Sequence, residues 1–269
     1  MPANKFDKLR NSRVLLLGGT SGIGFATAEA SIEAGAIVII SGSNPDRLNG
    51  ALSKLRASYP EASAANKIHG YTCDVSQAST LEGNLKGLLE FATDSNNNKI
   101  DHIVYTAGTV PHLPSLSEYE TSETKTSELI VRHDTPLMLG KLAPAHMNPG
   151  PRSSITLTSA STAAKPVPGR GMLSALMAST EGIARGLAVD LAPIRVNVVA
   201  VGTIDTELLT SLMGPDPEVR AKYYEIFRKG TLLDTVGAAE DVAEAYVYLM
   251  KDAYITGDVI HTSGGRLLK

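Results

Sequence analysis

Strand-length and helix-length segments alternate along nearly the whole chain, and this alternation constrains the fold more than any other feature. Apolar, β-branched runs recur at Arg13–Leu17, Ala36–Ser41, Ile68–Cys73, Ile100–Thr106, Ser154–Thr158, Ile194–Val201 and Asp258–Thr262. Apolar residues at helical spacing are clearest in Gly22–Ala34, Asp46–Ala57, Ala78–Thr93 and Ser174–Ala192. Right-handed crossovers place such helices on both faces of a parallel sheet. The pattern therefore predicts a single-domain α/β fold, a doubly wound parallel sheet of the Rossmann type.

The composition fits one soluble domain over residues 1–269. Hydrophobic residues make up 43% of the chain, and α/β folds of about 250 residues commonly form around one core. The formal charge of −3 is spread along the chain and predicts no nucleic-acid partner. No apolar run approaches the roughly 20 residues of a membrane span. A polar N-terminus and a lone cysteine, Cys73, favour a cytoplasmic protein without disulfides.

The segment Asp205–Thr235 interrupts the regular alternation. It carries Gly214-Pro215-Asp216-Pro217 inside an otherwise helical pattern and follows a late strand. In a doubly wound fold that position lies at the carboxyl edge of the sheet, where ligands bind. We expect a substrate lid at 205–235, with a plain surface hairpin of helices as the alternative.

A glycine-rich loop, Leu17–Gly24, follows the first strand directly and opens a helix. Gly18 allows a tight turn, Gly22 lets the backbone approach a pyrophosphate, and Gly24 lets the helix pack closely. The free N–H groups and the positive dipole end of that helix attract phosphate. The predicted cofactor contacts in the loop are Gly18, Thr20, Ser21, Gly22, Ile23 and Gly24.

The end of the second strand indicates which nicotinamide cofactor binds. An NAD enzyme usually has an acid there, which holds the ribose 2′-hydroxyl. This chain instead has hydroxyl and amide groups followed by a cation, at Ser41, Ser43, Asn44 and Arg47. NADP(H) is therefore the predicted cofactor. Asp46 is the nearby acid, and we expect it to complement the dipole of the following helix.

Several further landmarks, together with the glycine spacing G-x-x-x-G-x-G, resemble the short-chain dehydrogenase/reductase family over essentially the whole chain. These landmarks are Asp74 after the third strand, Tyr105-Thr106-Ala107-Gly108, Arg195-Val196-Asn197 and Val201-Gly202. The resemblance implies that Asp74 contacts the adenine side, that Gly108 lines the cofactor, and that the stretch Thr203 to Thr206 contacts the nicotinamide amide. The remaining expected cofactor contacts are Val75, Ala107 and Gly202.

The resemblance also implies a catalytic centre whose usual residues are replaced. In the family a Tyr protonates the substrate oxygen, a Lys lowers the pKa of that Tyr, and a Ser steadies the oxyanion. Aligning Glu181–Ala188 with the family's helix five gives Leu173 for the Tyr, Met177 for the Lys, Ala160 for the Ser, and Arg132 for an Asn of helix four. General acid catalysis contributes roughly 10²–10⁴ in rate, so ordinary carbonyl reduction is expected to be impaired.

Two kinds of reaction remain possible without that Tyr. Hydride transfer to an iminium carbon needs no proton donor, and a cyclisation needs only a shaped, polarising pocket. The stretches Gly18–Ala26, Gly42–Pro45, Arg195–Val199, Asp241–Tyr246, Ile255–Gly257 and Gly264-Gly265 are similar to a fungal branch of the family, the iminium reductase/Diels–Alderases of malbrancheamide and paraherquamide biosynthesis. That branch also lacks the Tyr and Lys and has an Arg at the position of Arg132. Its loop Asp and Trp align with Val167 and Arg170 here.

Three cations are the candidate catalytic residues: Arg132, Lys165 and Arg170. Arg132 could hold the cofactor, orient a carbonyl or stabilise negative charge, unless it faces solvent or a subunit interface. Lys165 and Arg170 could replace the proton donor or bind an acidic substrate, unless they are solvated loop charges. A tyrosine from another element could also serve as the acid, and the candidates are Tyr105, Tyr119, Tyr223 and Tyr224.

The leading hypothesis is an NADP(H)-binding enzyme of secondary metabolism that acts on an apolar or heterocyclic small molecule. The alternatives are a ketoreductase with a relocated acid and a nonenzymatic NADP(H)-sensing protein. No paired His or Cys spacing suggests a metal site. The resemblance implies a homo-oligomer, a dimer or tetramer. Small residues on one face of the helix-five segment support this expectation, and these are Ala175, Ala178, Ser179, Gly182 and Gly186.

Overall fold

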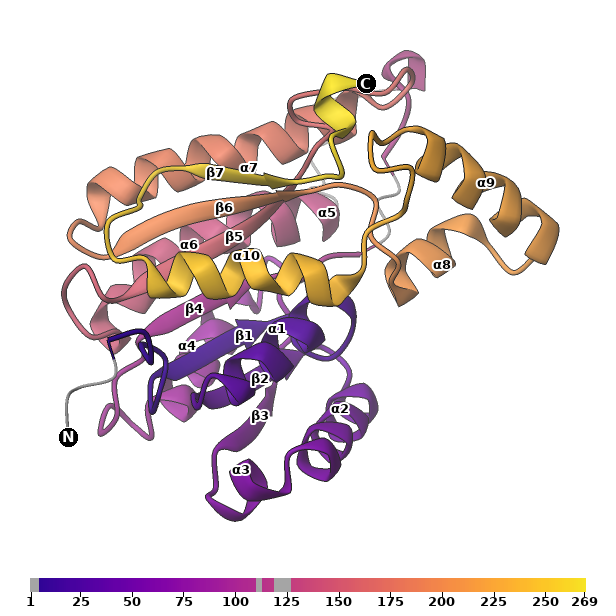
Figure 1. Ribbon diagram of the computed structural model, residues 1–269. Coiled ribbons are helices and arrows are strands. Elements are labelled where there is room, and N and C mark those ends of the chain that lie inside the picture. The colour runs from indigo at the N-terminus through magenta and orange to yellow at the C-terminus, as the bar shows by residue number, and fades with distance from the viewer. Residues whose placement is uncertain (1–4, 110–112, 119–126) are drawn as a thin grey trace.

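Seven parallel strands form a single sheet in the order β3-β2-β1-β4-β5-β6-β7 (Figure 1). The computed structural model describes residues 5–109, 113–118 and 127–269. The strands are β1 (Arg13–Leu17), β2 (Ile37–Gly42), β3 (Ile68–Thr72), β4 (His102–Tyr105), β5 (Ser154–Ala160), β6 (Arg195–Val201) and β7 (Val259–Thr262). The predicted doubly wound sheet is confirmed, and the expected strand Ile100–Thr106 is shorter than its apolar run.

Helices cover both faces of the sheet, because successive strand residues point to opposite sides. Leu15 and Leu17 of β1 belong to the core under α4 (Leu81–Ala92), α6 (Thr135–Leu142) and α7 (Gly171–Asp190). Val14 and Leu16 belong to the core under α1 (Gly22–Glu33), α2 (Pro45–Ser58) and α10 (Ala239–Lys251). These four strand residues are at most 2% exposed. A short α3 (Pro60–Ala64) leads into β3.

The helical segment that contains Arg132 is not a regular α-helix. Between α5 (Ser127–Leu129) and α6, a π-helical turn spans Ile130–Asp134. Pro136 explains the irregularity, because it has no N–H to donate to the carbonyl of Arg132 four residues earlier. The Thr180 hydroxyl of α7 donates to that carbonyl instead, at 3.2 Å. Such turns recur at functional sites, and this one brings the Arg132 guanidinium beside Gly108.

Two helices, α8 (Glu207–Met213) and α9 (Pro217–Lys229), form the segment that interrupts the alternation. Gly214 has a φ of +83°, which ends α8, and the Asp216 carboxylate caps α9 by accepting from the Glu218 N–H at 2.9 Å. The pair projects beyond the sheet (Figure 1) and has its own small apolar cluster, Leu209, Met213 and Val236, with Tyr224 and Phe227 packed against it. This segment is therefore packed separately from the two main cores.

The small-residue face of α7 lies on the outside of the molecule. Ala175, Ala178, Gly182 and Gly186 are exposed, and Ser179 is half-buried. A Cβ atom placed on Gly182 or Gly186 would meet no described atom within 4 Å. Homo-oligomer formation through this face stays a prediction. Among the described helices, none combines the length and the apolar character that crossing a membrane requires.

Candidate active site

A cleft of about 800 Å³ opens at the carboxyl ends of the strands. It lies where the chain order reverses between β1 and β4, the position at which doubly wound sheets bind ligands. One wall comes from the loop after β1 and the ends of β2 and β3, and the other from the ends of β5 and β6 with α7, α8 and α9. The fold therefore brings the predicted cofactor loop and the interrupting segment to one site.

In the loop after β1, positive φ angles or close packing require glycine at several positions. Gly18 has a φ of +90°, and its N–H donates to the Ser41 carbonyl at 2.9 Å. A Cβ atom on Gly24 would lie 2.2 Å from the Gly18 carbonyl oxygen, so only glycine permits this approach of α1. The expected role of Gly22 at a pyrophosphate stays a prediction, but a Cβ atom there would first meet the Thr206 methyl group at 3.0 Å. That glycine therefore also admits the segment carrying α8.

The N-terminus of α1 is suited to hold a phosphate group. Ser21 is its N-cap residue, yet the Ser21 side chain makes no capping hydrogen bond, and the first turn has no acidic residue. The first N–H groups of a helix need an acceptor. Because no side chain of the cap supplies one here, an anion in the cleft can do so. This observation shows that the residues present fit a dinucleotide pyrophosphate.

Of the cofactor residues predicted at the end of β2 and just after it, three line the cleft and one does not. Ser43 and Arg47 are exposed and line the cleft, and Ser41 lines it from the buried strand end. Asn44 does not line the cleft, and its Oδ1 atom instead accepts from the Arg47 N–H at 2.9 Å, capping α2. The structure thus gives Asn44 a capping role, and its contact with a cofactor stays a prediction. Asp46 lies in the first turn of α2, as expected for an acid that complements the helix dipole.

Most of the other predicted cofactor contacts lie along the same cleft. Asp74 and Val75 follow β3, and the Asp74 carboxylate accepts from the Ser76 N–H at 2.9 Å. The residues brought together here are Gly18, Thr20, Ser21, Gly22, Ile23, Gly24, Ser41, Ser43, Arg47, Asp74, Val75, Ala107, Gly108, Gly202, Thr203 and Thr206. Their contact with a cofactor stays a prediction.

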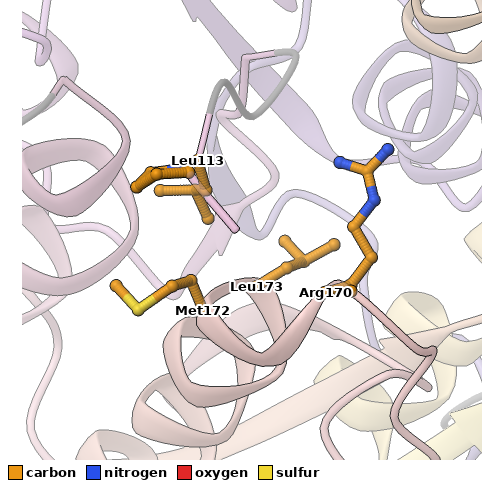
Figure 2. Close-up of a pocket in the computed structure, with 6 residues that line it drawn as sticks. Leu113, Arg170, Met172 and Leu173 are labelled. Carbon is orange, nitrogen blue, oxygen red and sulfur yellow. The ribbon is translucent and has the colours of Figure 1, made fainter. Parts of the chain in front are cut away.

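The α7 wall of the cleft presents apolar groups at the positions where the resemblance places a proton donor and its Lys partner. Leu173 and Met177 both line the cleft, and Met177 is 2% exposed. Figure 2 shows Arg170, Met172 and Leu173 at the start of α7, with Leu113 on the opposite side of a small adjoining pocket. The Ser159 hydroxyl donates to the Met177 carbonyl at 3.0 Å, so it points at α7. Neither Leu173 nor Met177 can donate a proton.

Arg132 faces the cleft from the π-helical turn. Its Nη2 atom donates to the Thr109 carbonyl at 3.4 Å, and a Cβ atom on Gly108 would lie 2.6 Å from Nη2. Its Nε atom is buried and has no hydrogen-bond partner among the described residues. Burial lowers the pKa of Arg132, while the nearby Tyr105 and Glu128 raise it. The side chain remains a cation at neutral pH, and it has spare donor capacity.

Lys165 does not reach the cleft, contrary to the expectation. Its Nζ atom donates to the Arg266 carbonyl at 3.1 Å, and Arg266 Nη1 donates back to the Lys165 carbonyl at 3.0 Å. Arg170 does line the cleft, as does Arg266, which the sequence did not indicate. The reciprocal pair spans 101 positions of the chain, so no local pattern could have indicated it.

Of the candidate replacement acids, Tyr223 alone among the described ones lines the cleft. The Tyr105 hydroxyl is buried and donates to the Val131 carbonyl, and burial raises the pKa of Tyr105. The Tyr224 hydroxyl donates to Asp205 at 3.1 Å, and burial raises its pKa as well. Tyr223 is 45% exposed and its ring stacks near that of Phe227. Tyr119 lies outside the described residues.

Cys73 is a buried core residue, as the sequence suggested, and burial raises its pKa to about 12. In the described part of the chain, no three His, Cys, Asp or Glu side chains gather as a metal site would require.

Comparison with known proteins covers almost the whole chain. Residues 5–269 match the SDR-like Rossmann domain family. Short-chain dehydrogenase/reductase malC of Malbranchea aurantiaca is 41% identical over 263 residues, which cover 98% of this chain and 97% of that protein. The solved structure of MalC reductase/Diels-Alderase from Malbranchea aurantiaca is similar with a TM-score of 0.90, at 41% identity and with 99% of this chain and 100% of that chain covered. A solved small-chain dehydrogenase in complex with NADPH is 25% identical, with a TM-score of 0.74 over 96% of this chain and 100% of that one.

Proposed function

Since the chain belongs to the short-chain dehydrogenase/reductase family, we propose that it is an NADP(H)-dependent enzyme of secondary metabolism that works without the family's Tyr acid. Its substrate is an apolar or heterocyclic small molecule with an iminium-like acceptor carbon. The same cleft can guide a cyclisation. The similarity to MalC, whose name describes a reductase/Diels-Alderase, supports both activities.

The observation that carries this proposal is the chemistry of the side chains on two sides of the space for the substrate. On one side Leu173 and Met177 of α7 offer no proton, and on the other Arg132 offers a guanidinium with spare donors. NADPH, when bound, supplies a hydride. An iminium carbon already carries the positive charge needed to accept it, so no side chain has to protonate the product. Arg132 then orients a polar group of the substrate.

The cofactor is held by the opposite wall. The uncapped N-terminus of α1 receives the pyrophosphate, and Ser43 and Arg47 receive the 2′-phosphate of NADP(H). The NADPH complex of a structural relative supports this choice. The segment 205–235 acts as a lid, because α8 and α9 add Leu208, Leu212, Tyr223 and Ile226 to the cleft, each between 42% and 53% exposed. Closing over a substrate would cover this apolar surface.

The test compares cyclic imines with ketones. Purified protein and NADPH are incubated with N-carboxymethyl-3,4-dihydroisoquinolinium, a permanent iminium that has no net charge, or with cyclohexanone, and NADPH absorbance and product formation are followed. We expect the rate of iminium reduction to exceed the rate of ketone reduction by roughly 10²-fold or more. A ketone needs a general acid, and its absence costs about this factor in rate. Leu173→Tyr combined with Met177→Lys serves as the matched variant and should not increase the imine rate.

Efficient turnover of cyclohexanone by the unmodified protein would overturn the proposal. It would favour the second candidate, a ketoreductase that uses Tyr223, the described tyrosine that lines the cleft. Tyr223→Phe should then abolish ketone turnover. Tight NADPH binding without turnover of any imine or ketone would instead indicate a nonenzymatic NADP(H)-sensing protein.

A further inference from the structure

Guanidinium groups dominate the charge of the cleft away from the cofactor loop. Arg132, Arg170 and Arg266 line this part, each from a different element of the fold. Arg170 precedes the first turn of α7, and Arg266 lies in the short helical turn Arg266–Leu268 at the end of the chain. The three cations therefore line one cleft although they come from distant parts of the sequence.

The carboxylates that line the cleft lie elsewhere. Asp74 follows β3 and accepts the Ser76 N–H. The Glu207 carboxylate lies beside the loop after β1, 3.7 Å from the position of a Cβ atom on Gly22. Glu128 is buried near Arg132 and offsets part of that charge. Neither Arg170 nor Arg266 forms an ion pair with any carboxylate of the described residues.

Unpaired cations in a concave, partly apolar site attract anions and repel cations, because low-dielectric walls focus the field. A guanidinium also presents a planar fork of donors that matches a carboxylate or an enolate. The apolar groups next to Arg170 are Leu173 and Val167. A ligand that satisfies both features has an apolar body and one acidic oxygen group close to it.

We infer that the substrate of this cleft carries an acidic oxygen group, a carboxylate or an enolised 1,3-dicarbonyl, and that Arg170 binds it with Arg266 nearby. The inference rests on the proposed function, since it concerns the same site. An iminium-bearing substrate would then enter without net positive charge, because its acidic group balances the charge of the iminium. The apolar body packs on Leu173, and the acidic group lies at the start of α7.

The test uses three naphthalene probes of similar shape: naphthaleneacetate, naphthaleneacetamide and naphthylethylamine. Their affinities are measured by calorimetry on the protein alone and on the protein loaded with NADP⁺. We expect the anion to bind about tenfold more tightly than the amide, as one charge-assisted hydrogen bond provides, and the amine to bind most weakly. Arg170→Gln should remove the preference for the anion and leave NADP⁺ affinity unchanged.

Arg185→Gln is the matched control, because Arg185 lies on the exposed side of the same helix and does not line the cleft. This control should leave all three affinities as they are. Equal binding of the three probes, tighter binding of the amine, or an anion preference that survives Arg170→Gln would overturn the inference. Failure of NADP⁺ to bind would contradict the proposed function alone, since the probe affinities of the protein without cofactor would still test the charge preference.

Discussion

The two walls of the cleft are specified in different ways. The cofactor wall depends on backbone: glycines at 18 and 24 that tolerate no Cβ atom, and a helix end left without a cap. The α7 wall depends on side chains, because Leu173 and Met177 project from α7 and Arg170 from the residue just before it. Cofactor binding is therefore constrained by the fold itself, whereas the chemistry opposite can change by substitution on an unchanged helix.

Gly24→Ala should disrupt the cofactor wall by adding one methyl group. Among the variants considered, we expect it to cause the largest loss of cofactor binding. The new Cβ atom would lie 2.2 Å from the Gly18 carbonyl and 2.4 Å from the Thr106 hydroxyl, so either α1 or the loop must move. The free energy of unfolding should fall by about 3 kcal/mol, typical of overpacking, with no measurable NADP⁺ binding. Thermal unfolding and calorimetry measure the two effects.

Gly50→Ala provides the control for that prediction. Gly50 lies in α2, and a Cβ atom there meets nothing within 4 Å. Alanine is favoured over glycine in a helix by roughly 0.5–1 kcal/mol, so this variant should be slightly more stable and bind NADP⁺ normally. If Gly24→Ala behaved like Gly50→Ala, the cofactor wall would not depend on its backbone geometry.

Arg132→Ala should affect the reaction and spare the cofactor. The guanidinium faces the cleft with a buried Nε atom that has no described partner. Loss of one such donor typically costs 10²–10³ in rate, by analogy with oxyanion-hole donors. Single-turnover imine reduction should slow by about that factor, while the Kd for NADPH stays within a fewfold. An unchanged rate would remove Arg132 from the proposed mechanism.

The sequence indicated the backbone of the loop after β1 because the signals for it are local. The first strand begins and ends where its apolar run does, and Gly18 and Gly24 follow it at fixed spacing. The other wall was less accessible. The sequence did not indicate that Lys165 contacts Arg266 or that Arg266 lines the cleft, because this contact joins a loop to the last residues of the chain. On the cofactor side, the sequence did not indicate that Asn44 Oδ1 caps α2, because an Asn can serve as a helix cap or as a ligand contact.

Arg47→Ala tests the prediction of NADP(H) over NAD(H), with a smaller expected effect. Arg47 is exposed and lines the cleft near Ser43, at the end where the resemblance places the 2′-phosphate. Removing one charge-assisted contact should weaken NADP⁺ binding about tenfold and leave NAD⁺ binding nearly unchanged. Titration of both cofactors measures this, and a parallel loss for both would show that Arg47 does not discriminate between them.

Glu207→Gln should produce the smallest effect, in the opposite direction. The Glu207 carboxylate lies 3.7 Å from the position of a Cβ atom on Gly22, beside the site that we assign to the pyrophosphate. Two like charges repel, but Glu207 is exposed, so solvent and salt screen the repulsion over about 10 Å at 0.1 M ionic strength. NADP⁺ should therefore bind the variant two- to threefold more tightly, roughly the effect of an exposed charge pair, and the gain should shrink as salt is added.

Glu218→Gln is the control, because Glu218 is an exposed acid in the first turn of α9 that does not line the cleft. A gain that appeared in both variants would reflect net charge alone. A gain confined to Glu207→Gln would mean that the segment 205–235, whose side chains also line the cleft, sets part of the cofactor affinity.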